Sequence, residues 1–123
     1  IDRTLSLKPN WAIAWNAKSV ILWQAEKYQE ALQANDRALA SAPNYFQGWF
    51  NRGRVLRAMQ QNQAAIAAYD RAIVSDVTLV PAASIAAVWT NRSAVLLDLG
   101  QYQEAIASAN SAIAIDPNSV SAW

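Results

Sequence analysis

The sequence repeats itself with a period near 34 residues, and this repeat limits the fold more than any other feature. Tryptophans recur at spacings of 34, 40 and 34 residues, at Trp15, Trp49, Trp89 and Trp123. Prolines follow the same period with the same six-residue insertion, at Pro9, Pro43 and Pro117. Small residues share the phase, because Ser19, Gly53 and Ser93 each follow a Trp by four residues. Such a period is typical of solenoids, whose units pack on their neighbours.

Within each unit the apolar residues follow a helical period. They recur at steps of three and four residues from Ala12 to Gln24, and again from Tyr28 to Leu39. A short turn separates the two helices, and Gly100 suits the left-handed end of a helix in the third unit. Each of the three periodic prolines is followed by Asn, which we expect to cap the next first helix, at Asn10, Asn44 and Asn118. The sequence therefore predicts an all-α chain of antiparallel helix pairs.

The recurring residues also match a known pattern. In the first unit they are Trp15, Ser19, Leu22, Tyr28, Ala31, Ala38 and Pro43. This pattern resembles the tetratricopeptide repeat. The run Trp-x-Asn-Arg followed by Gly or Ser, at Trp49 and Trp89, resembles a variant frequent in bacterial multi-repeat proteins. The resemblance covers the whole chain and implies a right-handed α-solenoid of three full repeats, with partial repeats at both ends.

We expect one domain with an interruption after its second repeat. Its parts are the end of a preceding repeat (1–9), repeat 1 (12–45), repeat 2 (46–79), an insertion (80–85), repeat 3 (86–119) and the start of a further repeat (120–123). Val77 stands where the helix-ending Pro would be, and Pro81 suits the first turn of a helix. We expect Ala82 to Val88 to extend the first helix of repeat 3, with a longer loop as the alternative.

Residues that recur in every repeat are interpreted as packing positions. We expect the Trp column to be buried beside the small residues, which let paired helices approach closely. Arg52 and Arg92, each three residues after a Trp, recur with this frame. We therefore assign these two arginines a structural or edge role.

The resemblance implies a peptide site on the concave surface that first helices line. Its positions lie two residues before each Trp, and one, five and eight residues after it. They are Ile13, Asn16, Val20 and Trp23 in repeat 1, Gln47, Phe50, Arg54 and Arg57 in repeat 2, and Ala87, Thr90, Ala94 and Leu97 in repeat 3. Asn51 and Asn91 flank them. The residues that we expect to matter most are Asn16, Val20, Trp23, Phe50, Asn51, Arg54, Arg57, Asn91 and Leu97.

These candidates combine aromatic, amide and cationic groups. Trp23 and Phe50 have no aromatic counterpart in the other repeats, and Arg54 and Arg57 lie one helical turn apart. Such a groove suits a peptide with a bulky apolar side chain and a carboxylate. In the alternative interpretation the arginines form a solvated helix face, or Arg57 pairs with Asp98 of the next repeat.

One tetratricopeptide class grips the C-terminal carboxylate of chaperone tails. It requires Lys and Asn in its first repeat, Asn in its second, and Lys and Arg in its third. The matching residues here are Asn16, Val20, Asn51, Ala87 and Asn91. Since only Asn51 fits, the resemblance does not extend to that binding mode.

Composition argues against other classes of function. The chain has no His and no Cys, and its scattered acidic residues form no group, so we expect no catalytic site, no metal and no cofactor. Ten basic against nine acidic residues disfavours nucleic-acid binding. The longest uncharged stretch, 15 residues from Val77 to Asn91, is shorter than the roughly 20 residues of a spanning helix.

Two functions remain from the sequence. The first is a protein–protein interaction scaffold that binds a peptide or partner segment in the concave groove. The alternative is a self-associating or spacer segment of a larger protein, without a ligand of its own. Exposed solenoid ends would form the homo-oligomer, through Ile1, Leu5, Leu7, Val120 and Trp123. An unchanged association state in Trp123→Ser would contradict that alternative.

Overall fold

The computed structural model describes residues 9–117, which form six α-helices and no strand. The helices are α2 (Pro9–Gln24), α3 (Tyr28–Ser41), α4 (Phe46–Ala58), α5 (Asn62–Ile73), α6 (Ala82–Asp98) and α7 (Tyr102–Ile115). The all-α prediction is therefore confirmed. Ile1, Leu5, Leu7, Val120 and Trp123, and the capping role expected for Asn118, lie outside the described residues.

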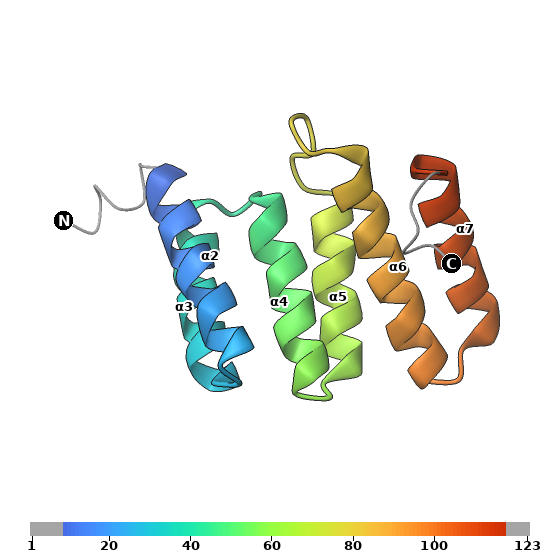
Figure 1. Cartoon of the computed structure of the whole chain (residues 1–123), viewed down its shortest axis with the longest axis horizontal. Helices are drawn as coiled ribbons and strands as arrows, with labels where there is room; N and C mark the ends of the chain where they lie inside the picture. Colours follow the sequence, from blue (N-terminus) through green and yellow to red (C-terminus); the bar gives the residue numbers. More distant parts are fainter. Residues whose placement is uncertain (1–8, 118–123) are drawn as a thin grey trace.

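Three helix pairs stand side by side in chain order, α2 with α3, α4 with α5 and α6 with α7 (Figure 1). Neighbouring pairs meet where α3 contacts α4 and where α5 contacts α6. The first helices also contact each other, α2 with α4 and α4 with α6, whereas within residues 9–117 the second helices do not. The stack therefore curves with its first helices on the inner side, as expected for the concave surface.

The turn inside each pair uses a left-handed residue at the same place. Glu26, Gln60 and Gly100 have φ angles of 63°, 61° and 75°. The left-handed ending predicted at Gly100 is confirmed. The other two turns adopt the same conformation with residues that carry a Cβ atom, for which this region is strained.

The predicted Asn caps are wrong where the structure describes them. Helix α2 already begins at Pro9, so Asn10 lies inside its first turn. The N-cap of α4 is Tyr45, and no side chain caps it. The backbone of this loop is instead paired with the next one, because the Asp76 N–H donates to the Asn44 carbonyl oxygen at 3.3 Å.

The interruption after repeat 2 lengthens a helix, as predicted. Helix α6 starts at Ala82, directly after its N-cap Pro81, and has 17 residues where α4 has 13. The alternative of a longer loop in place of this extension is not observed. A loop of residues 74–81 nevertheless remains before α6 and projects beyond the helix ends in Figure 1.

The small residues do bring paired helices together. The Ser19 and Ser93 hydroxyls donate to the carbonyl oxygens of Ala31 and Ala105, at 2.7 and 2.8 Å. In the middle repeat, a Cβ atom on Gly53 would lie 2.3 Å from the Tyr69 ring. The glycine therefore makes room for a tyrosine that is completely buried.

The three described members of the Trp column, Trp15, Trp49 and Trp89, are half-buried, although we expected them to be buried. Each indole is covered on one face by a guanidinium group, at 4.9 to 5.8 Å from the ring centre; the pairs are Arg37 on Trp15, Arg71 on Trp49 and Arg92 on Trp89. A cation that stacks on an indole contributes about 0.5–1 kcal/mol at exposed sites. The column is a packing feature that stays in partial contact with solvent.

The structural role assigned to Arg52 and Arg92 is confirmed. Arg52 donates to the carboxylate of Asp36, on the preceding second helix. Arg92 makes the same link to Asp70, at 2.8 Å, and also donates to the Ser108 hydroxyl at 2.7 Å. Equivalent ion pairs therefore join repeat 1 to repeat 2 and repeat 2 to repeat 3.

Candidate functional site

Three consecutive first helices contribute side chains to one cavity on the inner side of the stack. It has a volume of about 430 Å³. Its lining residues are Trp23 of α2, Arg54, Arg57 and Ala58 of α4, and Asn91 of α6. We call it the cationic cavity. The structure thus brings together four of the nine candidate residues, Trp23, Arg54, Arg57 and Asn91.

Arg54 is clamped between two aromatic rings. Its guanidinium carbon lies 4.8 Å from the ring centres of both Trp23 and Phe50. Burial lowers the pKa of Arg54, and the nearby Tyr69 opposes that change. An arginine remains protonated in spite of such burial. Arg54 therefore brings a positive charge to the cavity lining, while its buried Nε atom has no hydrogen-bond partner among the described residues.

Arg57 forms the pair with Asp98 that the alternative interpretation anticipated. The two charged groups lie 3.9 Å apart, and 37% and 56% of their side-chain surfaces are exposed. An exposed pair of this kind contributes only about 0–1 kcal/mol. Exchange of Asp98 for the carboxylate of a ligand would therefore cost little.

Phe50 and Asn51 lie beneath the groove surface, although we expected both to face a ligand. Phe50 is 8% exposed and packs against the rings of Phe46 and Tyr69, at 6.0 and 6.2 Å between centres. Asn51 is 1% exposed, and its amide donates to the Ser19 hydroxyl at 2.8 Å. Phe50 is therefore held by rings of its own repeat, whereas Asn51 is bonded to the preceding repeat.

The remaining candidates lie outside the cationic cavity. Asn16 and Val20 are half-buried on α2, and the Asn16 side-chain oxygen is buried without a partner among the described residues. Leu97 is 55% exposed on α6. Asn91, inside the cavity, donates its amide to the Ala87 carbonyl oxygen at 2.7 Å.

Tyr69 packs against Phe50, one of the two rings that hold Arg54, and was not among the candidates. Burial raises its pKa to about 12, against the opposing effects of Arg57 and Arg54. The phenol is therefore neutral at ordinary pH, and its buried oxygen has no partner among the described residues. Its sequence signal was a bulky residue where the other repeats have Asn35 and Ala109.

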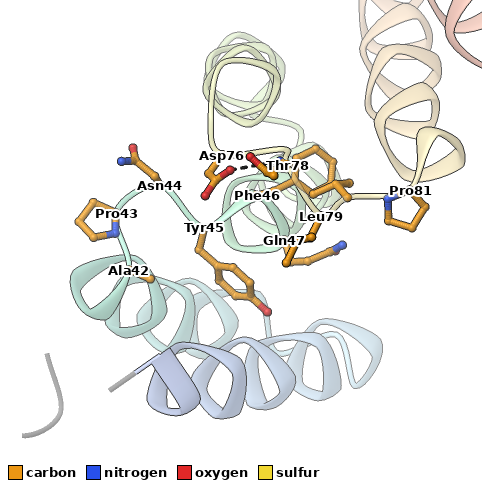
Figure 2. A pocket seen from close by; sticks show the side chains of 11 residues that line it. Ala42, Pro43, Asn44, Tyr45, Phe46, Gln47, Asp76, Thr78, Leu79 and Pro81 are labelled. Carbon is orange, nitrogen blue, oxygen red and sulfur yellow. Dashed lines mark hydrogen bonds between the residues drawn. The ribbon is translucent and has the colours of Figure 1, made fainter. Parts of the chain in front are cut away.

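A second cavity, of about 770 Å³, lies where two inter-repeat loops meet the start of α4 (Figure 2). We call it the loop pocket. Its lining residues are Ala42, Pro43, Asn44, Tyr45, Phe46, Gln47, Asp76, Thr78, Leu79, Val80 and Pro81. No pocket was predicted here. The insertion was its only sequence signal, because the longer second loop supplies almost half of the lining.

The described residues give no indication of two other kinds of site. Between residues 9 and 117, no three His, Cys, Asp or Glu side chains lie close enough to hold a metal ion. In the same range, every helix is too short or too polar to cross a membrane.

Solved structures show the same fold at low sequence identity. The first TPR of Spaghetti (RPAP3), bound to the HSP90 peptide SRMEEVD, is 18% identical with a TM-score of 0.80; the match covers 94% of this chain and 87% of that one. The N-terminal domain of stress-induced protein-1 from C. elegans is 14% identical with a TM-score of 0.81, covering 88% and 86%. The Yersinia enterocolitica translocator chaperone SycD is 18% identical with a TM-score of 0.78, covering 92% and 80%.

Among known protein families, one family model matches the sequence. No curated protein sequence matches the chain. The family model for the tetratricopeptide repeat matches residues 1–46 and 50–120. This match spans nearly the whole chain and agrees with the helix pairs and their recurring Trp and small residues. The protein therefore belongs to the tetratricopeptide-repeat family.

Proposed function

We propose that this protein is a protein–protein interaction scaffold whose concave groove binds a peptide segment of a partner. The cationic cavity is the anchor of the site. A carboxylate of the peptide pairs with Arg54 and Arg57, and a bulky apolar side chain packs on the exposed part of Trp23. Asn91 supplies an amide to the peptide backbone or side chains.

The observation that carries this proposal is the state of Arg54. Its charge is held by two aromatic rings at 4.8 Å, and its buried Nε has no partner among the described residues. A buried donor without an acceptor costs about 1–3 kcal/mol. The cation forms no ion pair within residues 9–117, and a ligand carboxylate would pair with its terminal guanidinium nitrogens; the rings already hold the guanidinium in place, so little ordering entropy is lost on binding.

A structural neighbour supports the same chemistry. The first TPR of Spaghetti (RPAP3) is bound to the peptide SRMEEVD, which is rich in carboxylates. The present chain lacks the residues of the chaperone-tail class, apart from Asn51. We therefore propose an acidic peptide that is held through a different set of side chains, on α2, α4 and α6.

The experiment is a selection from a displayed random-peptide library against the folded chain. Arg54→Met/Arg57→Gln removes both charges, and Met keeps an unbranched apolar stem between the two rings. We expect the selected peptides to carry Asp, Glu or a free C-terminus, and to lose binding to this variant.

The matched control is Arg37→Gln/Arg71→Gln, which removes the same number of charges on the second helices and should retain binding. Circular dichroism checks that all variants fold. Neutral peptides, or peptides that still bind after both groove arginines are replaced, would contradict the proposal.

Self-association remains a second candidate because α7 carries an exposed apolar face. Ile106 and Ile113 are 61% and 41% exposed. Their counterparts in the earlier repeats are half-buried at the contact with the following first helix; they are Leu32, Ile66, Leu39 and Ile73. If the α7 face pairs with another copy, sedimentation will show association that Ile106→Ser/Ile113→Ser removes. A monomer at all concentrations would exclude this candidate.

A further inference from the structure

The loop pocket exists because the two inter-repeat loops differ in length. Residues 42–45 connect α3 to α4, whereas residues 74–81 connect α5 to α6. The longer loop folds over the start of α4 and leaves a hollow between itself and the shorter loop (Figure 2). This pocket is separate from the cationic cavity, since the two have no lining residue in common.

The walls of the pocket are braced by hydrogen bonds. The Asp76 N–H donates to the Asn44 carbonyl oxygen, and Tyr45 and Asp76 form an isolated parallel bridge between the loops. The Val80 N–H closes a turn onto the Val77 carbonyl oxygen at 3.0 Å. Because these bonds already fix both loops, a ligand would bind without a large ordering cost.

Most of the lining is apolar. Phe46 forms the floor and is 2% exposed, while Leu79 stands at the rim with 95% of its surface exposed. Pro43, Val80 and Pro81 add further apolar surface. Burial of one Leu side chain contributes about 1.5–3 kcal/mol, so an apolar ligand group that covers Leu79 would gain affinity from the contact.

The single charge in the lining is negative. Asp76 accepts a hydrogen bond from the Thr78 N–H at 3.1 Å, as the dashed line in Figure 2 marks. Hydrogen bonds from Thr78 lower the pKa of Asp76, so the carboxylate is ionised at neutral pH. Asp76 forms no ion pair within residues 9–117. A ligand with a cation beside its apolar group would complement this charge.

We propose that the loop pocket is a second docking site, for a partner-protein segment that carries a bulky apolar side chain next to Lys or Arg. The apolar side chain fills the space between Phe46 and Leu79, and the cation pairs with Asp76. The proposal goes beyond peptide binding in the groove. It does not depend on Arg54 or Arg57, and the two sites prefer opposite charges.

The experiment is an NMR titration of the chain with the blocked peptide acetyl-Gly-Ser-Leu-Lys-Ser-Gly-amide. Comparison peptides replace Lys by Gln or Glu, or Leu by Ser. We expect saturable shifts of the backbone amides of Asn44, Gln47, Thr78 and Leu79. Replacing Lys by Glu should weaken binding about two- to five-fold. Replacing Leu by Ser should weaken it about ten-fold or more.

Variants of the chain identify the pocket as the site of these shifts. Asp76→Asn keeps the acceptor for Thr78, and it should remove the preference for Lys over Glu while the preference for Leu remains. Leu79→Ser should weaken binding of every Leu peptide. Ile21→Ser removes another exposed apolar side chain, on α2 and outside the pocket lining, and should change nothing. Arg54→Met/Arg57→Gln should also leave these shifts unchanged, which separates this site from the groove.

Three kinds of result would overturn the proposal. The first is the absence of shifts at the pocket amides, or equal affinity for the Lys and Glu peptides. The second is a shift of the same amides when protein concentration rises without peptide, which would assign the pocket to a second copy. The third is a shift of the pocket amides on addition of neutral phospholipid vesicles but not of peptide, which would identify the loop pocket as a lipid site.

Discussion

The turn inside each helix pair places one residue in the left-handed region, and this conformation is strained unless the residue is glycine. Glu26, Gln60 and Gly100 occupy the same left-handed position, yet only the third is glycine. The periodicity of the sequence indicated the turn in each repeat but not its conformation, because a helical pattern ends in the same way for several turn types. Gly100 was the one residue whose chemistry pointed to it.

We predict that Glu26→Gly and Gln60→Gly each raise the free energy of unfolding by about 0.5–1 kcal/mol, because glycine removes the strain of a positive φ. Gly100→Ala should lower it by about 1 kcal/mol. A Cβ atom on Gly100 meets nothing within 4 Å, so that loss comes from the backbone alone. Urea unfolding measures the free energy of unfolding of all three variants. If Glu26→Gly is less stable than the unchanged chain, the left-handed residue is not strained and the explanation is wrong.

Gly53 and Tyr69, which pack against each other, occupy the positions that Ser19 and Asn35 have in the first repeat. The Cβ of Gly53→Ala would overlap the Tyr69 ring at 2.3 Å, so we predict a loss of about 1–3 kcal/mol in the free energy of unfolding. Gly53→Ser/Tyr69→Asn places the two first-repeat residues at these positions and removes the ring that Gly53 accommodates. Its cost should be smaller than the sum of the two single changes by about 1 kcal/mol or more. Strict additivity in urea unfolding would show that the two positions are not coupled.

At the scale of helices, the sequence predicted which segments are helical and which helices pair, but it predicted the burial of individual side chains less well. The extension of α6 after Pro81 was predictable because proline has a strong local preference there. The burial of Phe50 and Asn51 was not, because adjacent positions on one helix face divide between the groove, the paired helix and the neighbouring repeat. That division depends on the angle between stacked pairs, which no local pattern encodes.

Arg52 and Arg92 link neighbouring helix pairs through ion pairs with Asp36 and Asp70. Arg52 and Arg92 also donate to side chains that are 0–1% exposed, Asn35 and Ser108 respectively. Their removal leaves buried groups unsatisfied, so Arg52→Ala and Arg92→Ala should each lower the free energy of unfolding by about 1–3 kcal/mol.

The matched acidic variants should have a smaller effect. Asp36 and Asp70 have 63% and 52% of their side chains exposed. We expect Asp36→Ala and Asp70→Ala to cost about 0–1 kcal/mol each. Equal losses for the Arg and Asp variants in urea unfolding would mean that the ion pair alone carries the link.

For the whole molecule, stability is expected to follow position in the stack. Within residues 9–117, the pair α4–α5 is covered on both sides, whereas the pairs α2–α3 and α6–α7 are each covered on one. In a stack whose units contact only their neighbours, the covered pair opens least often. We predict the slowest amide hydrogen exchange in α4 and α5, measured by NMR. Uniform protection of all six helices would contradict this expectation and indicate one cooperative unit.

The central claim is that the cationic cavity binds a carboxylate-bearing peptide, and NMR tests it most directly. The measurement follows the Trp23 indole N–H and the Arg54 Nε–H signals while the acidic peptide chosen by the library selection is added. We predict saturable shifts of both signals, which an otherwise identical peptide with Gln, Asn and a C-terminal amide does not produce. If both signals stay in place while the peptide binds elsewhere, or if the neutral peptide shifts them equally, the groove account is wrong.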